Sequence, residues 1–169
     1  VGWQDWVCNI MLTGFFSTYF VWTFAVVYEL RWLNNGWWLL LVVFATSAYD
    51  TMAFFIGRTF GTHKITPKIS PKKTWEGTIG GFLGSIPAAI IIGYYFLSLD
   101  FFQTIILGIF IGILAFFGDL SVSWYKRYMG VKDMGSWIPG HGGLLDRIDS
   151  HLLVILGVSL LINKDIIYQ

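Results

Sequence analysis

The sequence predicts an all-α, polytopic helical membrane protein, and two features of its composition carry that prediction. Of the 169 residues, 56% are hydrophobic and 12% are charged, whereas a soluble domain carries about 25% charged residues. The apolar residues form long continuous runs, without the alternation that is typical of an outer-membrane barrel strand. The net charge of +1 and the single cysteine give no indication of nucleic acid binding or of a disulfide framework.

Several stretches are long enough to span a membrane. A spanning helix needs about 20 mostly apolar residues, because each adds about 1.5 Å toward a hydrocarbon core about 30 Å thick. We therefore expect about five transmembrane helices, at residues 10–30, 37–57, 78–97, 101–120 and 144–162. Small residues in the third helix would let another helix approach closely. They are Gly80, Gly81, Gly84 and Gly93.

The connections between these helices differ in length. Those at residues 31–36 and 98–100 are short, whereas those at about 58–77 and 121–143 are long and polar. Because two helices separate the long connections, both lie on the same side of the membrane. That side holds nine of the 11 lysines and arginines: Arg58, Lys64, Lys68, Lys72, Lys73, Lys126, Arg127, Lys132 and Arg147. By the positive-inside rule, the long connections are expected in the cytoplasm.

Acidic residues at the cytoplasmic ends of two predicted helices need an explanation. An unpaired carboxylate at membrane depth costs about 2.5–3.5 kcal/mol, so such residues usually face a cavity, a partner or an ion. Asp119 ends the fourth helix, and Asp146 and Asp149 share one face of the fifth. A bound Mg²⁺ would make this pair of like charges favourable. Alternatively, the helix dipole favours them and Arg147 or Lys132 neutralises them.

The first long connection has the residue types that bind phosphate. Lysines and hydroxyls lie together just before a predicted helix, where helix N-terminal amides also favour anions. These residues are Ser70, Lys72, Lys73 and Thr74. A basic loop that contacts only anionic lipid headgroups is the alternative. Asp50, within the second predicted helix, either lines a polar cavity or pairs with a basic residue of another helix.

The second long connection offers a similar set. Gly142 and Gly143 would let backbone amides approach an anion closely. His141 between them and Gly140 is a donor, a base or a structural tie between loops, and the sequence leaves all three open. Acids that suit Mg²⁺ and basic loops that suit phosphates, on one side of a membrane, indicate phosphoryl or nucleotidyl transfer at a lipid headgroup.

Residues 123–149, SWYKRYMGVKDMGSWIPGHGGLLDRID, strongly resemble the signature of the CDP-diacylglycerol synthases, also called phosphatidate cytidylyltransferases. The matching residues are Ser123, Lys126, Arg127, Lys132, Asp133, Pro139, His141, Gly142, Gly143, Asp146, Arg147 and Asp149. The runs ISPKKTWEGTIGG and FATSAYDTMAFFIGRTFG also look like this family, so the resemblance covers residues 40–160 or more. Family members carry additional N-terminal helices, which this chain is expected to lack.

The resemblance implies that residues 1–169 form one transmembrane catalytic domain. The reaction would be CTP plus phosphatidate to CDP-diacylglycerol plus diphosphate, with Mg²⁺ as cofactor, in phospholipid biosynthesis. It implies that Asp119, Asp146 and Asp149 hold the metal. The catalytic residues would be Asp119, Asp146, Lys126, Arg127 and His141. The substrate-binding residues would be Ser70, Lys72, Lys73, Thr74, Lys132, Asp133, Gly142, Gly143 and Arg147.

The resemblance further implies an integral protein of a bacterial-type inner membrane, with its active site facing the cytoplasm and the lipid bilayer as a partner. It also implies a homodimer, for which the glycine-lined third helix is one candidate face. Whether a second, monovalent cation shares the site stays open. The alternatives are a polyprenol or phytol-type lipid kinase, which transfers the γ-phosphoryl group to a lipid alcohol, and an ion-coupled transporter. The absence of an internal repeat in the sequence disfavours the transporter.

Overall fold

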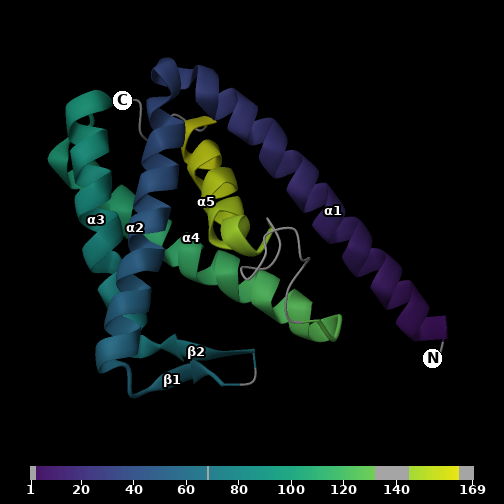
Figure 1. The fold of residues 1–169 in the computed structure, drawn as a ribbon. Helices are drawn as coiled ribbons and strands as arrows, with labels where there is room; N and C mark the ends of the chain where they lie inside the picture. The colour runs from purple at the N-terminus through teal and green to yellow at the C-terminus, as the bar shows by residue number, and fades with distance from the viewer. Residues whose placement is uncertain (1–2, 68, 132–144, 164–169) are drawn as a thin grey trace.

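The computed structural model describes residues 3–67, 69–131 and 145–163 (Figure 1). These residues form five α-helices and one small β-hairpin. In chain order, the elements are α1 (Trp3–Trp32), the 3₁₀-helix η1 (Leu33–Gly36), α2 (Trp37–Phe60), β1 (Lys64–Thr66), β2 (Ser70–Thr74), α3 (Trp75–Phe96), α4 (Phe101–Tyr128) and α5 (Leu145–Asn163). The predicted all-α, polytopic fold is confirmed.

Three stretches of the described residues are long and apolar enough to cross a membrane. They are Asn9–Phe60, Trp75–Phe96 and Phe101–Tyr128. The first stretch contains most of α1 and all of α2, and the chain reverses direction between them at η1. There Asn34, Asn35 and Gly36 have positive φ values of 44°, 55° and 84°, a conformation that asparagine and glycine tolerate best. The apolar part of α5, Ile148–Asn163, is shorter.

The predicted close approach at the third helix is observed between α3 and α2, which share the most extensive contact in the described structure. Gly80, Gly81 and Gly84 are buried against α2, and a Cβ atom at any of them would collide with Ile56, Tyr49 or the backbone of Ala48. Gly93 contacts Thr104 of α4 in the same way. Because α2 and α4 of the same chain cover these glycines, α3 does not present them to a second copy. The proposed dimer face is therefore wrong.

This packing predicts a large difference between two glycine-to-alanine substitutions. In Gly84→Ala the new Cβ would meet the carbonyl oxygen of Ala48, a backbone atom. Overpacking of this kind costs about 1–3 kcal/mol, so the midpoint of thermal unfolding in detergent should fall. Gly14→Ala is the matched control, because nothing lies within 4 Å of its Cβ position and alanine is the better helix former. Equal midpoints for the two variants would contradict this packing.

The helix ends differ from the prediction at the side that carries the long connections. α4 continues to Tyr128 instead of ending near residue 120, so Lys126 and Arg127 belong to a helix and the predicted loop at 121–143 begins too early. Val122 and Tyr125 are buried on this extension, and Tyr125 stacks on Phe16 of α1 with ring centroids 3.9 Å apart. A hydropathy pattern shows where the apolar run stops, whereas side-chain packing carries the helix two turns further.

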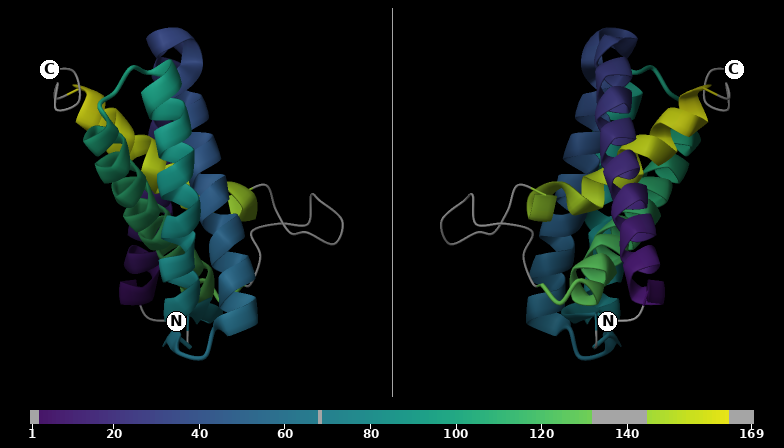
Figure 2. Two further views of the ribbon diagram at one scale, coloured as in Figure 1. Left: turned by 90° about the vertical axis from the view of Figure 1, so that its left-hand side faces the viewer. Right: turned by 90° about the vertical axis from the view of Figure 1, so that its right-hand side faces the viewer.

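The connection at 58–77 is also more ordered than the prediction. β1 and β2 pair antiparallel, with Lys64 opposite Thr74 and Thr66 opposite Ser70. The backbone amide of Trp75 donates to the carbonyl of His63, at 3.0 Å. Figures 1 and 2 show the hairpin at one end of the molecule, together with the end of α2, the start of α3 and the end of α4. The first connection and the end of α4, where the second connection begins, therefore lie at the same end of the molecule, while residues 132–144 lie outside the described structure.

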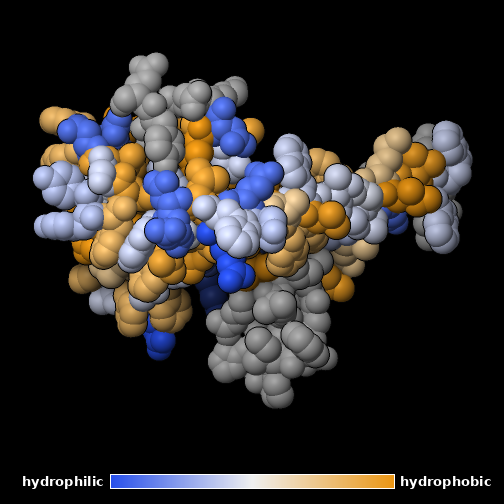
Figure 3. All heavy atoms as spheres, turned by 90° about the horizontal axis from the view of Figure 1, so that it is seen from above, coloured by the Kyte–Doolittle hydropathy of each residue, from blue (hydrophilic) through white to orange (hydrophobic). Residues whose placement is uncertain are grey.

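α1 runs diagonally and contacts α5 and α2. Seen from the end that carries η1, its N-terminal part projects from the rest of the molecule, with hydrophobic side chains near its tip (Figure 3). Trp3, Trp6 and Ile10 are all strongly exposed there. A large exposed apolar surface of this kind is typical of a membrane-contacting element. Together with the three spanning stretches, it defines an integral membrane protein.

Candidate functional site

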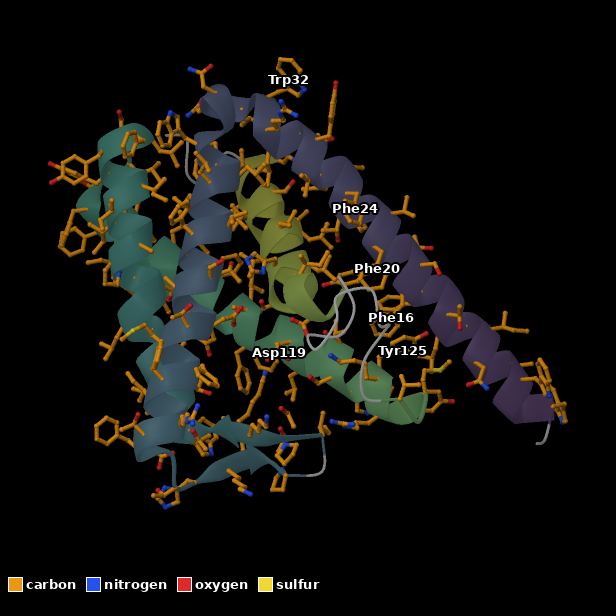
Figure 4. The ribbon with its side chains drawn as sticks, in the orientation of Figure 1. Phe16, Phe20, Phe24, Trp32, Asp119 and Tyr125 are labelled. Carbon is orange, nitrogen blue, oxygen red and sulfur yellow. The ribbon has the colours of Figure 1, made fainter. Side chains whose placement is uncertain are left out.

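A polar cavity of about 360 Å³ lies between the hairpin and helices α2 to α5. Its lining combines three carboxylates, two lysines and several hydroxyl groups. The lining residues are Tyr49, Asp50, Ala53, Phe54, Ser70, Lys72, Lys73, Thr74, Gly77, Thr78, Ala115, Phe116, Asp119 and Asp149. Figure 4 shows Asp119 on α4, in the space between α5 and the hairpin. The cavity thus joins segments that are up to 100 residues apart in the chain.

The three carboxylates come from three different helices. Asp50 of α2 accepts a hydrogen bond from the hydroxyl of Ser150, at 2.6 Å. Asp149 of α5 is buried, with 9% of its surface exposed, and its Oδ1 accepts from the backbone amide of Ser150 at 2.9 Å. Asp119 Oδ1 accepts from the hydroxyl of Ser123, one turn further along α4, at 3.0 Å. Hydrogen bonds therefore hold all three carboxylates in fixed orientations.

Lysines offset part of this negative charge. Lys73 Nζ lies 2.9 Å from Asp119 Oδ2, donates to the carbonyl of Phe116 at 3.3 Å, and sits 4.8 Å from the centroid of the Phe116 ring. Lys126 Nζ lies 3.6 Å from Asp149 Oδ2. Both lysine side chains are largely buried, with 16% and 11% of their surface exposed. Asp50 lines the cavity, and among the described residues it has no ion pair of this kind.

The start of α3 anchors the hairpin beside the cavity. Thr74 caps the helix, since its hydroxyl accepts from the amide of Gly77 at 3.2 Å. Glu76, in the first turn of α3, reaches back to the residues that precede β1. It accepts from the hydroxyl of Thr62 at 2.7 Å, and it binds both the ring and the backbone amide of His63. These bonds fix both ends of the hairpin and hence the position of Lys73.

Removing the Glu76 carboxylate should loosen the hairpin. In Glu76→Ala the bonds to Thr62 and His63 are lost, and amide hydrogen exchange across residues 62–74 should accelerate by roughly tenfold. Exchange in α2 should not change. Hydrogen exchange with mass spectrometry on the detergent-purified protein measures this directly. The matched control is Glu29→Ala on the exposed face of α1, and an equal response of the hairpin in both variants would contradict the anchoring role.

The structure places part of the predicted site around this cavity. Ser70, Lys72, Lys73, Thr74, Asp119 and Asp149 line it, and Lys126 and Arg127 lie beside it on the last turns of α4. Asp146 and Arg147 belong to the first turn of α5, but their side chains lie outside the described part of the chain. Lys132, Asp133, His141, Gly142 and Gly143 fall within 132–144, also outside the described residues. Their roles stay predictions.

Sequence reasoning missed several residues of the cavity. Tyr49 and Thr78 line it, and Ser150 connects α5 to Asp50 of α2. Ser150 directly follows Asp149, which is the one signal that could have pointed to it. Tyr49 and Thr78 gave none, because an aromatic residue and a threonine in apolar helices are indistinguishable from packing residues until the helices are arranged.

The donor set fits a hard divalent cation. Carboxylate oxygens are the ligands that Mg²⁺ prefers, and Asp119 and Asp149 present such oxygens to the same cavity. Within the described part of the chain, no three histidine, cysteine, aspartate or glutamate side chains gather closely enough to hold a metal by themselves. Asp146 precedes Asp149 by one turn of α5, so we predict that the Asp146 carboxylate completes the set of metal ligands.

Fold and cavity together define a helical integral membrane protein with a charged site at one end of its bundle. The chain belongs to the cytidylyltransferase family, whose family model matches residues 4–164. This finding confirms the family that residues 123–149 resemble. It also accounts for the match of runs that lie far from that signature, on α2 and at the start of α3.

Two curated relatives are named as phosphatidate cytidylyltransferases. Phosphatidate cytidylyltransferase of Staphylococcus haemolyticus is 42% identical over 123 residues, which cover 72% of this chain and 46% of that protein. Phosphatidate cytidylyltransferase 4, chloroplastic, of Arabidopsis thaliana is 50% identical over 109 residues, covering 62% of this chain and 27% of that protein. The chain therefore spans less than half the length of these relatives.

A solved structure has a similar fold. It is described as that of an intramembrane enzyme for archaeal membrane lipids biosynthesis, and it superposes with a TM-score of 0.56. The superposition covers 73% of this chain and 77% of that one, at 18% sequence identity. At this identity the similarity concerns the fold alone, and it agrees with the arrangement of membrane helices seen here.

Proposed function

We propose that this chain forms the membrane-embedded catalytic core of a phosphatidate cytidylyltransferase, which converts CTP and phosphatidate to CDP-diacylglycerol and diphosphate. The observation that carries the proposal is the cavity in which Lys73 and Asp119 are paired, at one end of apolar spanning helices. Such a cavity is suited to phosphate chemistry at the membrane edge. The names of relatives that are 42% and 50% identical support the same reaction.

The chemistry needs positioning and charge neutralisation more than acid–base catalysis. An oxygen of the phosphatidate phosphate attacks the α-phosphorus of CTP, and the bond between that phosphorus and the diphosphate oxygen breaks. The attacking oxygen is already anionic, so no strong base has to remove a proton. The barrier comes from bringing several negative charges together in line, which cationic side chains and a metal reduce.

Different residues of the cavity would position the phosphates and neutralise their charge. The Lys73 ammonium, held by Asp119 and the Phe116 carbonyl, offsets charge on the CTP phosphates. Lys72 and the hydroxyls of Ser70 and Thr74 line the same wall and donate to phosphate oxygens. Asp119 and Asp149, with Asp146, would hold Mg²⁺, which supplies charge neutralisation on the triphosphate when bound. We expect chelation of divalent cations to abolish the reaction.

The basic residues suggest which side of the membrane the site faces. Among the described ones, Arg58, Lys64, Lys72, Lys73, Lys126 and Arg127 belong to the end that carries the hairpin, whereas Arg31 lies beside Trp32 at the opposite end (Figure 4). This asymmetry supports a cytoplasmic orientation of the cavity. It is the side on which CTP is available in a bacterial cell with an inner membrane.

Product analysis tests the proposed reaction. Detergent-purified protein is incubated with phosphatidate, Mg²⁺ and CTP labelled with ³²P at either the α- or the γ-phosphate, and lipids are then extracted. Lipid-soluble label from α-labelled CTP alone is the expected result. In a parallel incubation, a lipid alcohol replaces phosphatidate. Lipid-soluble label from γ-labelled CTP there would instead identify a lipid kinase and overturn the proposal. No transfer of either label by folded protein would overturn it as well.

A further inference from the structure

A second cavity, of about 290 Å³, lies between the tip of the hairpin and the last turns of α4. Every charged residue in the described part of its lining is cationic, in contrast to the mixed charge of the first cavity. The lining residues are Ile69, Ser70, Pro71, Lys72, Ser123, Lys126 and Arg127. Two hydroxyls and three cations therefore surround this space, and no carboxylate is among the described residues that line it.

Arg127 joins the two walls of this cavity. Its Nε donates to the backbone carbonyl of Ile69 at 3.2 Å, which connects the last turn of α4 to the hairpin. A guanidinium has further N–H donors besides Nε and presents them in a fixed plane that matches phosphate oxygens. The orientation of Arg127 is thus set before any ligand arrives, which reduces the entropy lost on binding.

The second cavity borders the first. Ser70 and Lys72 line both of them. Two further residues of the second cavity contact carboxylates of the first, because Ser123 donates to Asp119 at 3.0 Å and Lys126 Nζ lies 3.6 Å from Asp149. A phosphate group bound in the second cavity would accordingly lie next to a phosphate chain bound in the first.

We propose that the second cavity binds the phosphate monoester of the lipid substrate, while the first holds the triphosphate of the nucleotide; this inference rests on the proposed function. The charges separate the two ligands. A bare phosphate dianion is repelled by the three carboxylates of the first cavity, whereas a metal-bound triphosphate brings the cation that those carboxylates attract. The dianion is instead stabilised where it meets Lys72, Lys126 and Arg127.

The position of the cavity favours the lipid. It opens at the end of a membrane-spanning helix, where lysines and arginines commonly meet anionic headgroups. Phosphate groups from either substrate have the same chemistry, so the experiment has to distinguish a lipid phosphate from a terminal nucleotide phosphate.

Arg127→Gln tests the proposal through separate saturation curves for the two substrates. The Michaelis constant for phosphatidate should rise by roughly tenfold or more, because a charge-assisted contact to the dianion is lost, while that for CTP should stay within about twofold of the wild-type value. Arg58→Gln is the matched control, since it removes the same charge at the same end of the molecule but lines neither cavity. It should leave both constants unchanged.

Direct binding provides a readout that does not need turnover. Short-chain phosphatidate, short-chain phosphatidylglycerol and Mg²⁺–CTP are titrated into wild-type and Arg127→Gln protein in detergent. The wild type should prefer the monoester lipid to the diester, and the substitution should weaken phosphatidate binding alone. Arg127→Lys keeps the charge but loses the planar guanidinium, so its affinity for phosphatidate should lie between those of the wild type and Arg127→Gln. This variant also keeps the test valid if the Gln variant unfolds.

The results separate this inference from the proposed reaction. A weakened affinity for Mg²⁺–CTP with phosphatidate binding intact would assign the cavity to the nucleotide and overturn the inference. Unchanged binding of both ligands would overturn it too. If wild-type protein makes no CDP-lipid but binds phosphatidate in an Arg127-dependent manner, the proposed reaction fails and the lipid phosphate site stands.

Discussion

Asp119→Asn should reduce the rate of cytidylyl transfer by about a thousandfold. A bound metal stabilises the transition state by several kcal/mol, and each ~1.4 kcal/mol of activation free energy is a factor of ten in rate. Asparagine keeps the shape of the side chain and an oxygen for the Ser123 hydroxyl. It removes the charge that pairs with Lys73 and that would hold Mg²⁺. The loss should appear in the rate at saturating CTP and phosphatidate, measured as labelled CDP-lipid.

The matched control for this substitution lies on the same helix. Asp100 caps the opposite end of α4, where its side chain accepts from the backbone amide of Phe102, and asparagine is an equally good cap. Asp100→Asn should therefore keep both the thermal unfolding midpoint and the transfer rate of the wild type. Near-normal activity of Asp119→Asn would show that the Asp119 carboxylate of this cavity takes no part in the reaction, whatever the substitution does to stability.

Lys73→Gln is expected to have the second-largest effect, a loss of roughly 10²–10³ in the rate constant, as when one preorganised donor is removed from a charge-stabilising site. The Lys73 ammonium is 2.9 Å from Asp119 and largely buried, so bulk water cannot replace it. The variant also leaves the Asp119 carboxylate without its cation, which adds repulsion toward an incoming phosphate.

Lys64→Gln controls for the general effect of charge on the hairpin. Lys64 is on β1 and exposed, and it lines neither cavity. The transfer rate of this variant should match the wild type, because salt screens the charge of an exposed lysine that lies outside both cavities. If Lys64→Gln and Lys73→Gln lost activity equally, the role assigned to the buried Lys73–Asp119 pair would be wrong.

The sequence predicted the helices well because lipid imposes a simple rule. Apolar runs of about 20 residues span a membrane, so five runs predicted five helices. The same rule does not predict where a helix ends. α4 extends to Tyr128 because Tyr125 packs against Phe16 of α1, a helix distant in the sequence. That contact depends on how α1 leans across the bundle, which no local pattern indicates.

The hairpin was harder to predict than any helix. β2 has the sequence SPKKT, in which a proline and two lysines are typical of a loop. Its pairing with β1 depends on contacts at the base, where Glu76 binds Thr62 and His63. These hydrogen bonds join the segment that follows α2 to the first turn of α3.

The charged residues of the site were predictable as a set but not as an arrangement. Aspartates within apolar helices are costly enough to demand a partner, and that cost pointed to Asp50, Asp119 and Asp149. The particular partners followed only from the packing: Ser150 for Asp50, Lys73 for Asp119 and Lys126 for Asp149. The division of the lysines between two cavities is likewise a property of the folded chain.

The most direct test of the central claim follows the oxygen atoms of the reaction. Phosphatidate carrying ¹⁸O in its phosphate group is incubated with unlabelled CTP, Mg²⁺ and the purified protein. The masses of both products are then measured by mass spectrometry. If the lipid phosphate attacks the α-phosphorus of CTP, CDP-diacylglycerol retains all of the label and the diphosphate contains none. Label in the diphosphate, or the absence of a CDP-lipid from reactions with folded protein, would contradict the account.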